Sequence, residues 1–319
     1  MSRRLCFTVD LDRDVNDPVI GSSAAISLDR GDGNAPRFTS SEKGTGIILD
    51  LLDDLGMKAT FFAEARTLER THVGRTISGH EVGMHGLDHE DFTGSRTEVY
   101  LGHGEMRRIV EKSIQIIRDE VGRSPVGFRS PYMDPNEEML DFLYEYGISY
   151  DSSRYTYVSD RIVPTPSGSI CLTELPALKG ADAAGKAITS YLWPMHEGKR
   201  DPGDFISFFD RVKEGVCVVA THSWHMAETR SGGPMSDEEI GRNYDRTRKV
   251  LADLIDSGFE PVDARTAASH MLCSPSGGGI PSHILLKHRE ITSPCLARLS
   301  PVQRSPDRSM MSSALGSTG

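Results

Sequence analysis

Short apolar runs alternate with stretches of helical periodicity through most of the chain, and this alternation limits the possible folds more than any other feature of the sequence. A helix between two strands returns the chain to the same end of a sheet, so strands joined in this way lie parallel. Eight candidate strands in a chain of 319 residues fit a (β/α) barrel, with an open doubly wound sheet as the alternative. The candidate strands are Leu5–Leu11, Lys58–Ala63, His80–Met84, Val126–Arg129, Ile148–Asp151, Ile170–Leu175, Val216–Thr221 and Phe259–Val262.

Apolar faces and capping residues mark the helices between these strands. Apolar side chains recur at helical spacing in Thr45–Leu55 and in Glu105–Val121. Asp134, followed by a proline, predicts the start of another helix. Ser236 and Glu239 have the spacing of a capping box and predict a helix start near the C-terminal end of the folded region.

Two segments lack this periodicity. Residues 18–44 are rich in glycine, serine and charge, and we expect them to form a long loop after the first strand. From residue 273 onward the chain turns to serine, proline, glycine and arginine without sustained apolar spacing. We therefore assign residues 1–272 to one domain and expect 273–319 to be a disordered tail.

Charge and cysteine usage exclude several classes of protein. Thirty-six basic against 46 acidic side chains give a net charge of -10, so neither nucleic acid nor a membrane is expected as a partner. The apolar runs are too short to span a bilayer. The 5 cysteines are scattered without a C-x-x-C pair, which argues against disulfides and zinc thiolates. Because residues 1–12 also lack a signal-peptide core, we predict a cytoplasmic protein, and we leave a homo-oligomer open.

Polar residues gather directly after the predicted strands, where parallel α/β folds bind their ligands. His85 and His89 are four residues apart and can bind one metal ion. A carboxylate from the cluster around Asp10 and Asp12 would complete a set suited to Zn²⁺ or another divalent ion that holds a catalytic water. A solvated acidic turn is the alternative, although Asp10 continues an apolar run, where an unpaired charge is costly. Other strand ends carry Arg129, Asp151 and His222.

These motifs, in this order, resemble those of the NodB-homology polysaccharide deacetylases, also called carbohydrate esterase family 4. The resemblance covers about residues 4–265. The matching segments are Thr8–Asp12 for the first motif (more usually T-F-D-D), Thr60–Phe62 for the T-F-F strand, Gly79–His89 for G-x-E-[IV]-x-x-H-[ST]-x-x-H, Arg129–Tyr132 for R-x-P-Y, and His222 for the final histidine after an apolar strand.

The resemblance implies a distorted (β/α) barrel of seven or eight parallel strands and a role for each matching residue. Asp10 would be the general base, with Arg129 orienting it through charge-assisted hydrogen bonds. The backbone N–H of Tyr132 would bind the oxyanion, and His222 would be the general acid. Asp151 corresponds to the fourth motif, although the tryptophan of that motif is absent. The metal, with Zn²⁺ as the first candidate, would be held by Asp12, His85 and His89.

Besides the missing tryptophan, the chain departs from the family pattern at two places. One residue separates the two aspartates of the first motif, so Asp14 is an alternative to Asp12 as the metal ligand. Gly86 stands where the family has serine or threonine. Both features resemble the branch that contains intracellular peptidoglycan deacetylase-like and allantoinase-like members. His225 lies three residues beyond His222 and is the alternative general acid.

These features predict a hydrolase acting on carbon–nitrogen bonds other than peptide bonds. It would remove N-acetyl groups from an amino sugar or glycan, so the expected partner is a small-molecule or oligosaccharide N-acetylated substrate. One alternative is hydrolysis of a cyclic amide such as allantoin on the same scaffold, and another is an inactive glycan- or metabolite-binding protein. Trp193 and Trp224 could stack on a sugar face. Glu64, which follows the T-F-F strand, is expected to be a surface carboxylate.

Overall fold

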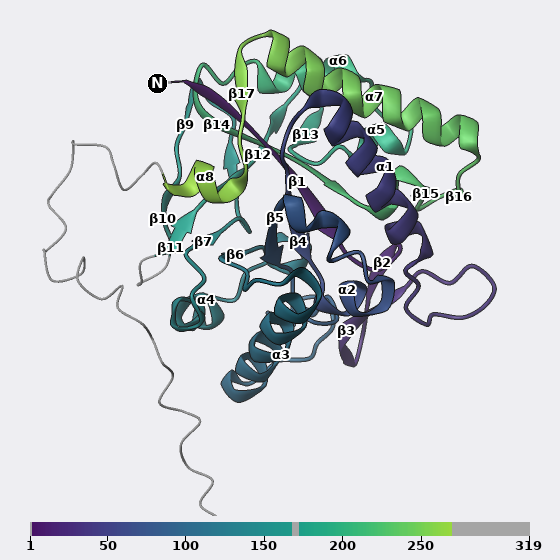
Figure 1. Cartoon of the computed structure of the whole chain (residues 1–319), viewed down its shortest axis with the longest axis vertical. Helices are drawn as coiled ribbons and strands as arrows, with labels where there is room; N and C mark the ends of the chain where they lie inside the picture. Colours follow the sequence, from purple (N-terminus) through teal and green to yellow (C-terminus); the bar gives the residue numbers. More distant parts are fainter. Residues whose placement is uncertain (1, 168–171, 270–319) are drawn as a thin grey trace, which may run out of the picture. The chain divides into compact units, whose positions relative to one another are not determined.

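The parallel strands form one curled sheet, as the computed structural model shows for residues 2–167 and 172–269 (Figure 1). The strands lie in the order β10-β11-β7-β6-β5-β4-β1-β14-β9, and β17 also pairs with β1. Every pairing in this sheet is parallel except β10 with β11. The strands are β1 (Arg3–Leu11), β4 (Thr60–Ala63), β5 (Glu81–Met84), β6 (Gly127–Phe128), β7 (Tyr150–Asp151), β9 (Arg161–Ile162), β10 (Thr165–Ser167), β11 (Leu172–Glu174), β14 (Glu214–His222) and β17 (Phe259–Pro261).

This half-barrel confirms the predicted fold, and each predicted strand overlaps an observed one. Residues 170–171 of one predicted strand lie outside the described residues, as do the predicted domain boundary and the tail 273–319. Within the described part of the chain, no helix is long and apolar enough to cross a membrane.

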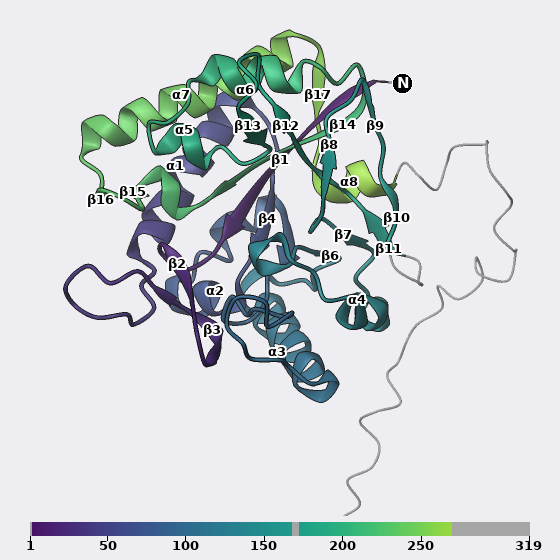
Figure 2. The same cartoon turned by 180° about the vertical axis from the view of Figure 1, so that it is seen from behind.

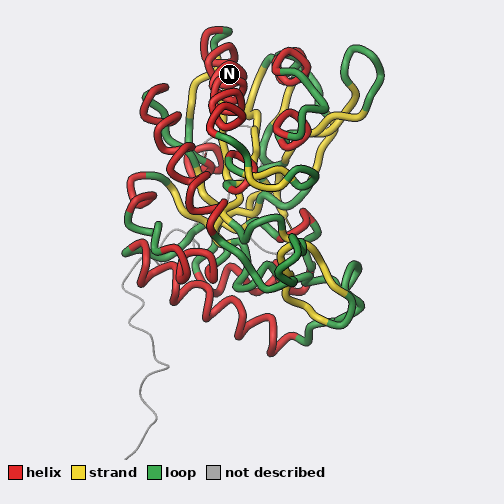
Figure 3. The backbone as a smooth tube through the Cα atoms, turned by 90° about the vertical axis from the view of Figure 1, so that its right-hand side faces the viewer, coloured by secondary structure: helices red, strands yellow, loops and turns green. Residues whose placement is uncertain are grey.

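The helices pack around the sheet in an order that follows the strands. Seen from the side, most of the helical tube lies on one side of the strands (Figure 3). Each helix contacts the next in the series α4 (Glu137–Leu143), α3 (His103–Val121), α2 (Ala65–Thr71), α1 (Thr39–Leu55), α7 (Asp237–Asp256) and α6 (Pro202–Phe209). The short helices are α5 (Trp193–His196) and α8 (Ala264–Ser269). The predicted helices 45–55 and 105–121 are confirmed within α1 and α3.

One of the two predicted helix caps is confirmed. Ser236 and Glu239 form the capping box of α7, in which each side chain accepts a hydrogen bond from the other residue's backbone N–H. The predicted cap at Asp134 is wrong, because its carboxylate accepts hydrogen bonds from the hydroxyls of Thr93 and Ser95 instead. The helix begins three residues later, where Asn136 accepts from the N–H of the third helical residue.

The expected loop at 18–44 is wrong in part, because this segment contains most of a hairpin and the first turn of α1. The strands β2 (Asn16–Val19) and β3 (Ser22–Ser27) pair antiparallel and stand apart from the main sheet (Figure 2). Backbone hydrogen bonds to residues 88–97 hold the hairpin in place, for example from the Ala25 N–H to the Asp88 carbonyl at 3.1 Å. Long-range contacts of this kind leave no apolar pattern in the sequence.

Two further sheets complete the described structure near the C-terminal side of the chain. One has three strands in the order β13-β12-β8 and the other has two. Their strands are β8 (Tyr155–Tyr157), β12 (Ala177–Ala181), β13 (Ala187–Thr189), β15 (Glu228–Thr229) and β16 (Gly233–Pro234).

Strand β1 places the polar residues on one face of the sheet. Successive side chains of a strand point to opposite faces. The odd-numbered apolar residues of β1, from Leu5 to Leu11, belong to the large core cluster that includes the residues of α1 and α3. Cys6 belongs to a second cluster with Phe62. The even-numbered series that Cys6 begins continues through Thr8 and Asp10, so these polar side chains share the face opposite α1 and α3.

Candidate active site

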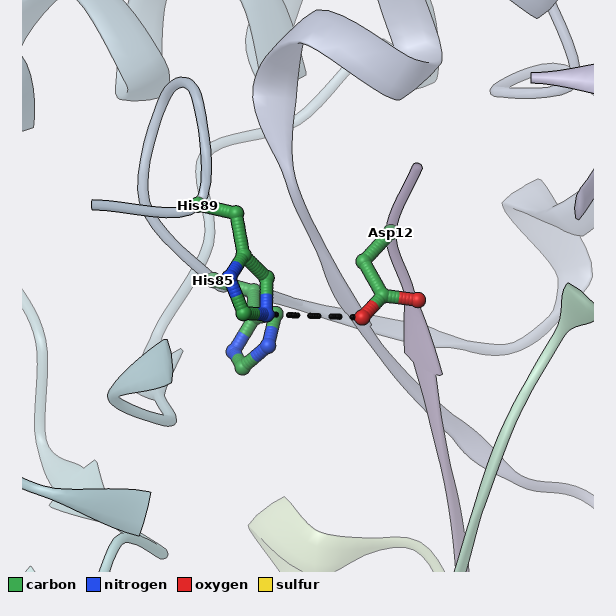
Figure 4. Close-up of side chains that lie close together, drawn as sticks. All are labelled: Asp12, His85 and His89. Carbon is green, nitrogen blue, oxygen red and sulfur yellow. Dashed lines mark ion pairs between the residues drawn. The ribbon is translucent and has the colours of Figure 1, made fainter. Parts of the chain in front are cut away.

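Asp12, His85 and His89 meet at the carboxyl ends of β1 and β5 (Figure 4). Asp12 directly follows β1, and both histidines belong to the segment after β5. One possible ligand atom from each of the three residues lies within 4.8 Å of the other two. His89 Nε2 is 3.4 Å from Asp12 Oδ2. Both histidine rings face the carboxylate, as metal ligands would.

The protonation of these three groups fits a divalent cation. Burial lowers the pKa of His85 to about 4 and that of His89 to about 3, so both rings are neutral at neutral pH. His85 Nδ1–H donates to the carbonyl of Arg129 at 2.8 Å, which leaves the Nε2 lone pair free. Asp12 Oδ1 and His89 Nδ1 are buried and have no hydrogen-bond partner among the described residues. Burial raises the pKa of Asp12, and a bound cation would offset that effect.

The backbone between the two histidines is held by Glu90. Its carboxylate accepts hydrogen bonds from the N–H groups of Leu87 and Asp88, both at 2.9 Å. Gly86 has a φ of +80°, and a Cβ added there would lie 2.7 Å from Glu90 Oε2. The replacement of the family's serine or threonine by glycine therefore matches the space that Glu90 occupies.

Asp10 is buried and receives two direct hydrogen bonds. Arg129 Nη1 donates to Asp10 Oδ1 at 2.8 Å, and the Tyr191 hydroxyl donates to Oδ2 at 2.6 Å. Burial alone would raise the pKa of Asp10, but Arg129, His85 and His222 outweigh it and lower the pKa to about 2. Asp10 is therefore a fixed carboxylate at neutral pH.

Arg129 is itself fixed by several partners. Its Nε and Nη2 donate to the backbone carbonyl and hydroxyl of Ser152 at 3.0 and 2.9 Å. Nη1 also donates to the Thr8 hydroxyl at 2.9 Å, and the guanidinium lies over the ring of Phe62. These contacts allow one orientation toward Asp10.

Asp151 lies away from the cavity beside these residues. It accepts a hydrogen bond from the Ser153 hydroxyl, and Ser153 Oγ accepts from the Ser130 N–H at 2.7 Å. Asp151 is also paired in register with Glu174 on the neighbouring strand. The structure thus gives Asp151 contacts that support the segment after Arg129, and it does not bring Asp151 to the other predicted site residues.

His222 faces the cavity, whereas His225 lies behind it. The register of β1 and β14 places His222 directly beside Asp10, and His222 Nε2 is 4.0 Å from Asp10 Oδ2. The side chain of His222 is 20% exposed, whereas that of His225 is 5% exposed and faces Glu197. Of the two histidines proposed as the acid, His222 is the one that a substrate can reach.

Tyr132 and Met133 border the cavity with an uncommon backbone conformation. Their φ angles are 60° and 56°, in the left-handed region that costs energy for residues other than glycine. The Tyr132 ring meets the His89 ring edge-on at a centroid distance of 4.6 Å. This conformation packs Tyr132 directly against one of the histidines of the cluster.

The cavity is small and largely aromatic. It has a volume of about 170 Å³. Trp193, at its edge, is 39% exposed, so its predicted stacking on a sugar stays a prediction. The same prediction is wrong for Trp224, which is buried and stacked on His225. The lining residues are Asp10, Asn16, His85, His89, Tyr132, Met133, Tyr155, Tyr191, Trp193 and His222.

Two acidic residues have structural contacts that the sequence did not reveal. Asp14, the alternative metal ligand, accepts hydrogen bonds from the N–H groups of Ser40 and Ser41 at the start of α1. Glu64 is fully buried and forms an ion pair with Arg13, whose Nε donates to it at 2.9 Å. The expectation of a surface carboxylate at Glu64 is therefore wrong, because a buried arginine neutralises it.

Sequence reasoning missed Tyr191, Tyr155 and Glu197. Tyr155 and Tyr191 line the cavity, and Glu197 faces the histidine behind it. These residues lie between β7 and β14, in a region of short strands without a strand-end motif. No spacing signal in the sequence marks them.

Comparisons with known proteins show what the chain is similar to. Residues 17–150 match the family model described as polysaccharide deacetylase. A peptidoglycan deacetylase-like protein of Gibberella zeae is 30% identical over 115 residues, which are 34% of this chain and 32% of that protein. A peptidoglycan deacetylase of Helicobacter pylori is 26% identical over 117 residues, 36% of this chain and 38% of that protein. These matches span only about a third of the length of the curated relatives.

Solved structures show the same fold at low sequence identity. A candidate polysaccharide deacetylase from Mycobacterium smegmatis has a TM-score of 0.58 and 22% identity, covering 88% of this chain and 94% of that one. Puue allantoinase has a TM-score of 0.57 and 14% identity, covering 86% and 92%. Over residues 17–150 the chain is thus similar to the polysaccharide deacetylase family, and the ordered motifs in and around this segment agree with that similarity.

Proposed function

We propose that this protein hydrolyses the N-acetyl amide of an amino sugar or glycan with the help of a divalent metal ion. Zn²⁺ is the first candidate for that ion. The observation that carries the proposal is the joint placement of an ionised carboxylate, a two-histidine, one-carboxylate cluster and a reachable histidine around one cavity. The names of the curated relatives add N-acetylated peptidoglycan sugars to the candidate substrates.

Asp12, His85 and His89 would hold the metal. When bound there, a divalent ion supplies a Lewis acid that polarises a carbonyl and acidifies a water molecule. The mixed nitrogen and oxygen donor set suits Zn²⁺.

The remaining steps belong to residues of the chain. Asp10, ionised and held by Arg129, takes a proton from the attacking water as the new carbon–oxygen bond forms. The Tyr132 N–H donates to the carbonyl oxygen as negative charge develops on it. His222 gives a proton from Nε2 to the departing nitrogen while the carbon–nitrogen bond breaks. The products are acetate and a free amine.

Metal content is the first test. Purified protein freed of metal and then reloaded should bind about one Zn²⁺ per chain, measured by elemental analysis. The His85→Ala/His89→Ala double variant should bind none, and Asp14→Ala is the matched control that keeps the ion. Wild-type protein that takes up no divalent metal would contradict the proposed mechanism.

The base is tested by Asp10→Asn, which keeps the shape of the side chain and removes its basicity. We expect acetate release to fall by roughly 10²–10⁴-fold, with metal content unchanged. The assay should cover N-acetyl glucosamine, its oligomers and peptidoglycan fragments. Turnover that survived this substitution would show that another group is the base.

A cyclic amide is the second candidate substrate, because the cavity is small. Its volume of about 170 Å³ is below the roughly 300–1,000 Å³ of common ligand pockets. An assay of allantoin ring opening, run in parallel with the assay of acetate release, distinguishes the two candidate substrates. Binding of these compounds without any turnover would favour the inactive binding protein.

We also propose that the protein is cytoplasmic, as its sequence predicts. Fractionation of the source cells tests this location.

A further inference from the structure

His222 contacts a second histidine on the side away from the cavity. His225 Nδ1 lies 3.3 Å from His222 Nδ1. Two imidazole nitrogens share a hydrogen bond only when one carries the proton and the other offers its lone pair. The tautomer of His222 is therefore coupled to that of His225.

Glu197 faces the other nitrogen of His225. Glu197 Oε1 is 3.5 Å from His225 Nε2, and the Glu197 side chain is 1% exposed. The same carboxylate accepts hydrogen bonds from the Arg230 N–H and, at 2.9 Å, from the Ser231 hydroxyl. Burial would raise the pKa of Glu197, but contacts with His225, Arg230 and Ser231 lower it to about 2. Glu197 is thus an ionised acceptor behind the histidine pair.

An ionised carboxylate beside His225 decides where the protons lie. It favours the proton on His225 Nε2, and His225 Nδ1 is then an acceptor. His222 must in turn carry its proton on Nδ1 to complete the hydrogen bond. The lone pair of His222 Nε2 then points toward Asp10, whose Oδ2 is 4.0 Å away.

We propose that Glu197 and His225 are positioning residues that hold His222 as its Nδ1–H tautomer, with Nε2 directed into the cavity. The proposal rests on the proposed function only in treating His222 as the acid. In that reaction His222 first takes up a solvent proton at Nε2 and becomes a cation, which the relay to Glu197 stabilises. The proton that Asp10 takes from the attacking water is returned to solvent, so the protons balance over one turnover. The Nε2–H bond then breaks as an N–H bond forms on the departing amine, and the ring returns to its neutral form.

Other charged groups also face the two rings and contribute to their titration. Burial lowers the pKa of both histidines. Arg230, Lys199 and His196 act on His225 and oppose its protonation. The groups that act on His222 besides His225 are Asp10, Asp12 and His85. Glu197 is the group that favours a charged His225.

The tautomer can be measured without knowing the substrate. Long-range ¹H–¹⁵N spectra of histidine-labelled protein report which ring nitrogen carries the proton, and a His222→Gln sample assigns the signals. We expect His222 to be protonated on Nδ1 in the wild type. In Glu197→Gln and His225→Phe we expect a mixture, or the Nε2–H form. Glu239→Gln is the matched control. Glu239 and Glu197 both line a further cavity, separate from the one that His222 faces, and a glutamine at position 239 keeps the α7 capping box.

Kinetics provide the second measurement. Loss of an orienting partner should lower kcat by about 10- to 100-fold with KM nearly unchanged, because neither residue lines the substrate cavity. His225→Asn should recover part of the loss, since its side-chain oxygen can accept from His222 Nδ1. A merely structural role would not give this recovery, nor would it move the acid limb of the kcat–pH profile.

The outcomes separate this proposal from the proposed function. An unchanged His222 tautomer in folded Glu197→Gln and His225→Phe would overturn the relay, whatever the activity. A shifted tautomer in a protein that releases acetate from no substrate would support the relay and count against the deacetylase. Loss of signal dispersion in His225→Phe would reflect unfolding, and Glu197→Gln would then decide.

Discussion

Gly86 shows how one residue adapts the segment between the two histidines. Its φ is positive, and any Cβ at this position would lie so close to Glu90 that the family's serine has no room. The carboxylate of Glu90 instead accepts the two backbone N–H groups of this turn. The turn is thus held here by a glycine and a glutamate that depend on each other.

The substitution Gly86→Ser should weaken both the fold and the metal site. We expect a loss of about 1–3 kcal/mol in the free energy of unfolding, because a side chain at this φ is strained. Urea unfolding and a Zn²⁺ titration measure the two effects. Gly241→Ser is the control, since that position in α7 has no atom within 4 Å of an added Cβ. Equal behaviour of the two variants would show that Glu90 moves aside without cost.

Among the residues of the candidate site, those that belong to sequence motifs could be predicted. Asp12, His85 and His89 could be found because they follow strands at a spacing that suits a metal. Tyr191 and Glu197 could not, since they approach Asp10 and His225 only through the folding of a segment without regular spacing.

The start of α1 depends on a side chain from another element. The carboxylate of Asp14 accepts the N–H groups of Ser40 and Ser41, as an N-cap residue would do from within the helix. A cap supplied over this sequence distance has no local pattern. For this reason the sequence predicted α1 from Thr45 onward, whereas the helix begins at Thr39.

Replacing Asp14 by alanine should therefore act on stability and not on metal binding. We expect the free energy of unfolding to fall by about 1 kcal/mol, a typical value for a lost N-cap, while Zn²⁺ content stays at the wild-type level. Asp12→Ala should lose the ion. Asp14→Asn, which keeps an acceptor oxygen, should recover most of the stability. Metal loss in Asp14→Ala, with metal retained in Asp12→Ala, would show that Asp14 is the metal ligand and that Asp12 is not.

The strands themselves were predictable because burial on both sides gives continuous apolar runs. β1 and β14 are such runs, and both were found close to their observed bounds. The hairpin of β2 and β3 is held by backbone contacts with residues 88–97. Its sequence therefore has no continuous apolar run from which the two strands could be predicted.

For the whole molecule, metal binding should raise stability by linking two parts of the sheet. The proposed ligands join the end of β1 to the segment after β5. At free Zn²⁺ about 100 times above Kd, the gain is about 2.7 kcal/mol, or roughly 5–10 °C in Tm. Calorimetry with Zn²⁺ and with a chelator measures this difference. The His85→Ala/His89→Ala variant should show none.

The acid limit of this stabilisation follows from the buried histidines. The folded-state pKa of His85 is about 4, below the usual value of about 6.5. The ring therefore stays neutral and able to bind at about pH 6, where we expect Zn²⁺ still to raise Tm. The same shift destabilises the metal-free fold in acid: the unfolded chain takes up the proton first, so the free energy of unfolding falls from about pH 6.5 toward the folded pKa. Loss of the Zn²⁺ effect already at about pH 6 would contradict this account.

The pairing of β1 with β14 has a consequence for the order in which a growing chain acquires its abilities. Asp10 is made early in synthesis, but its register partner His222 comes much later. Asp12, His85 and His89 are all present before the second half of the chain exists. In the proposed mechanism, a nascent chain would have its metal ligands long before its acid. Regain of hydrolysis during refolding would then report the docking of β14, while uptake of metal would report an earlier event.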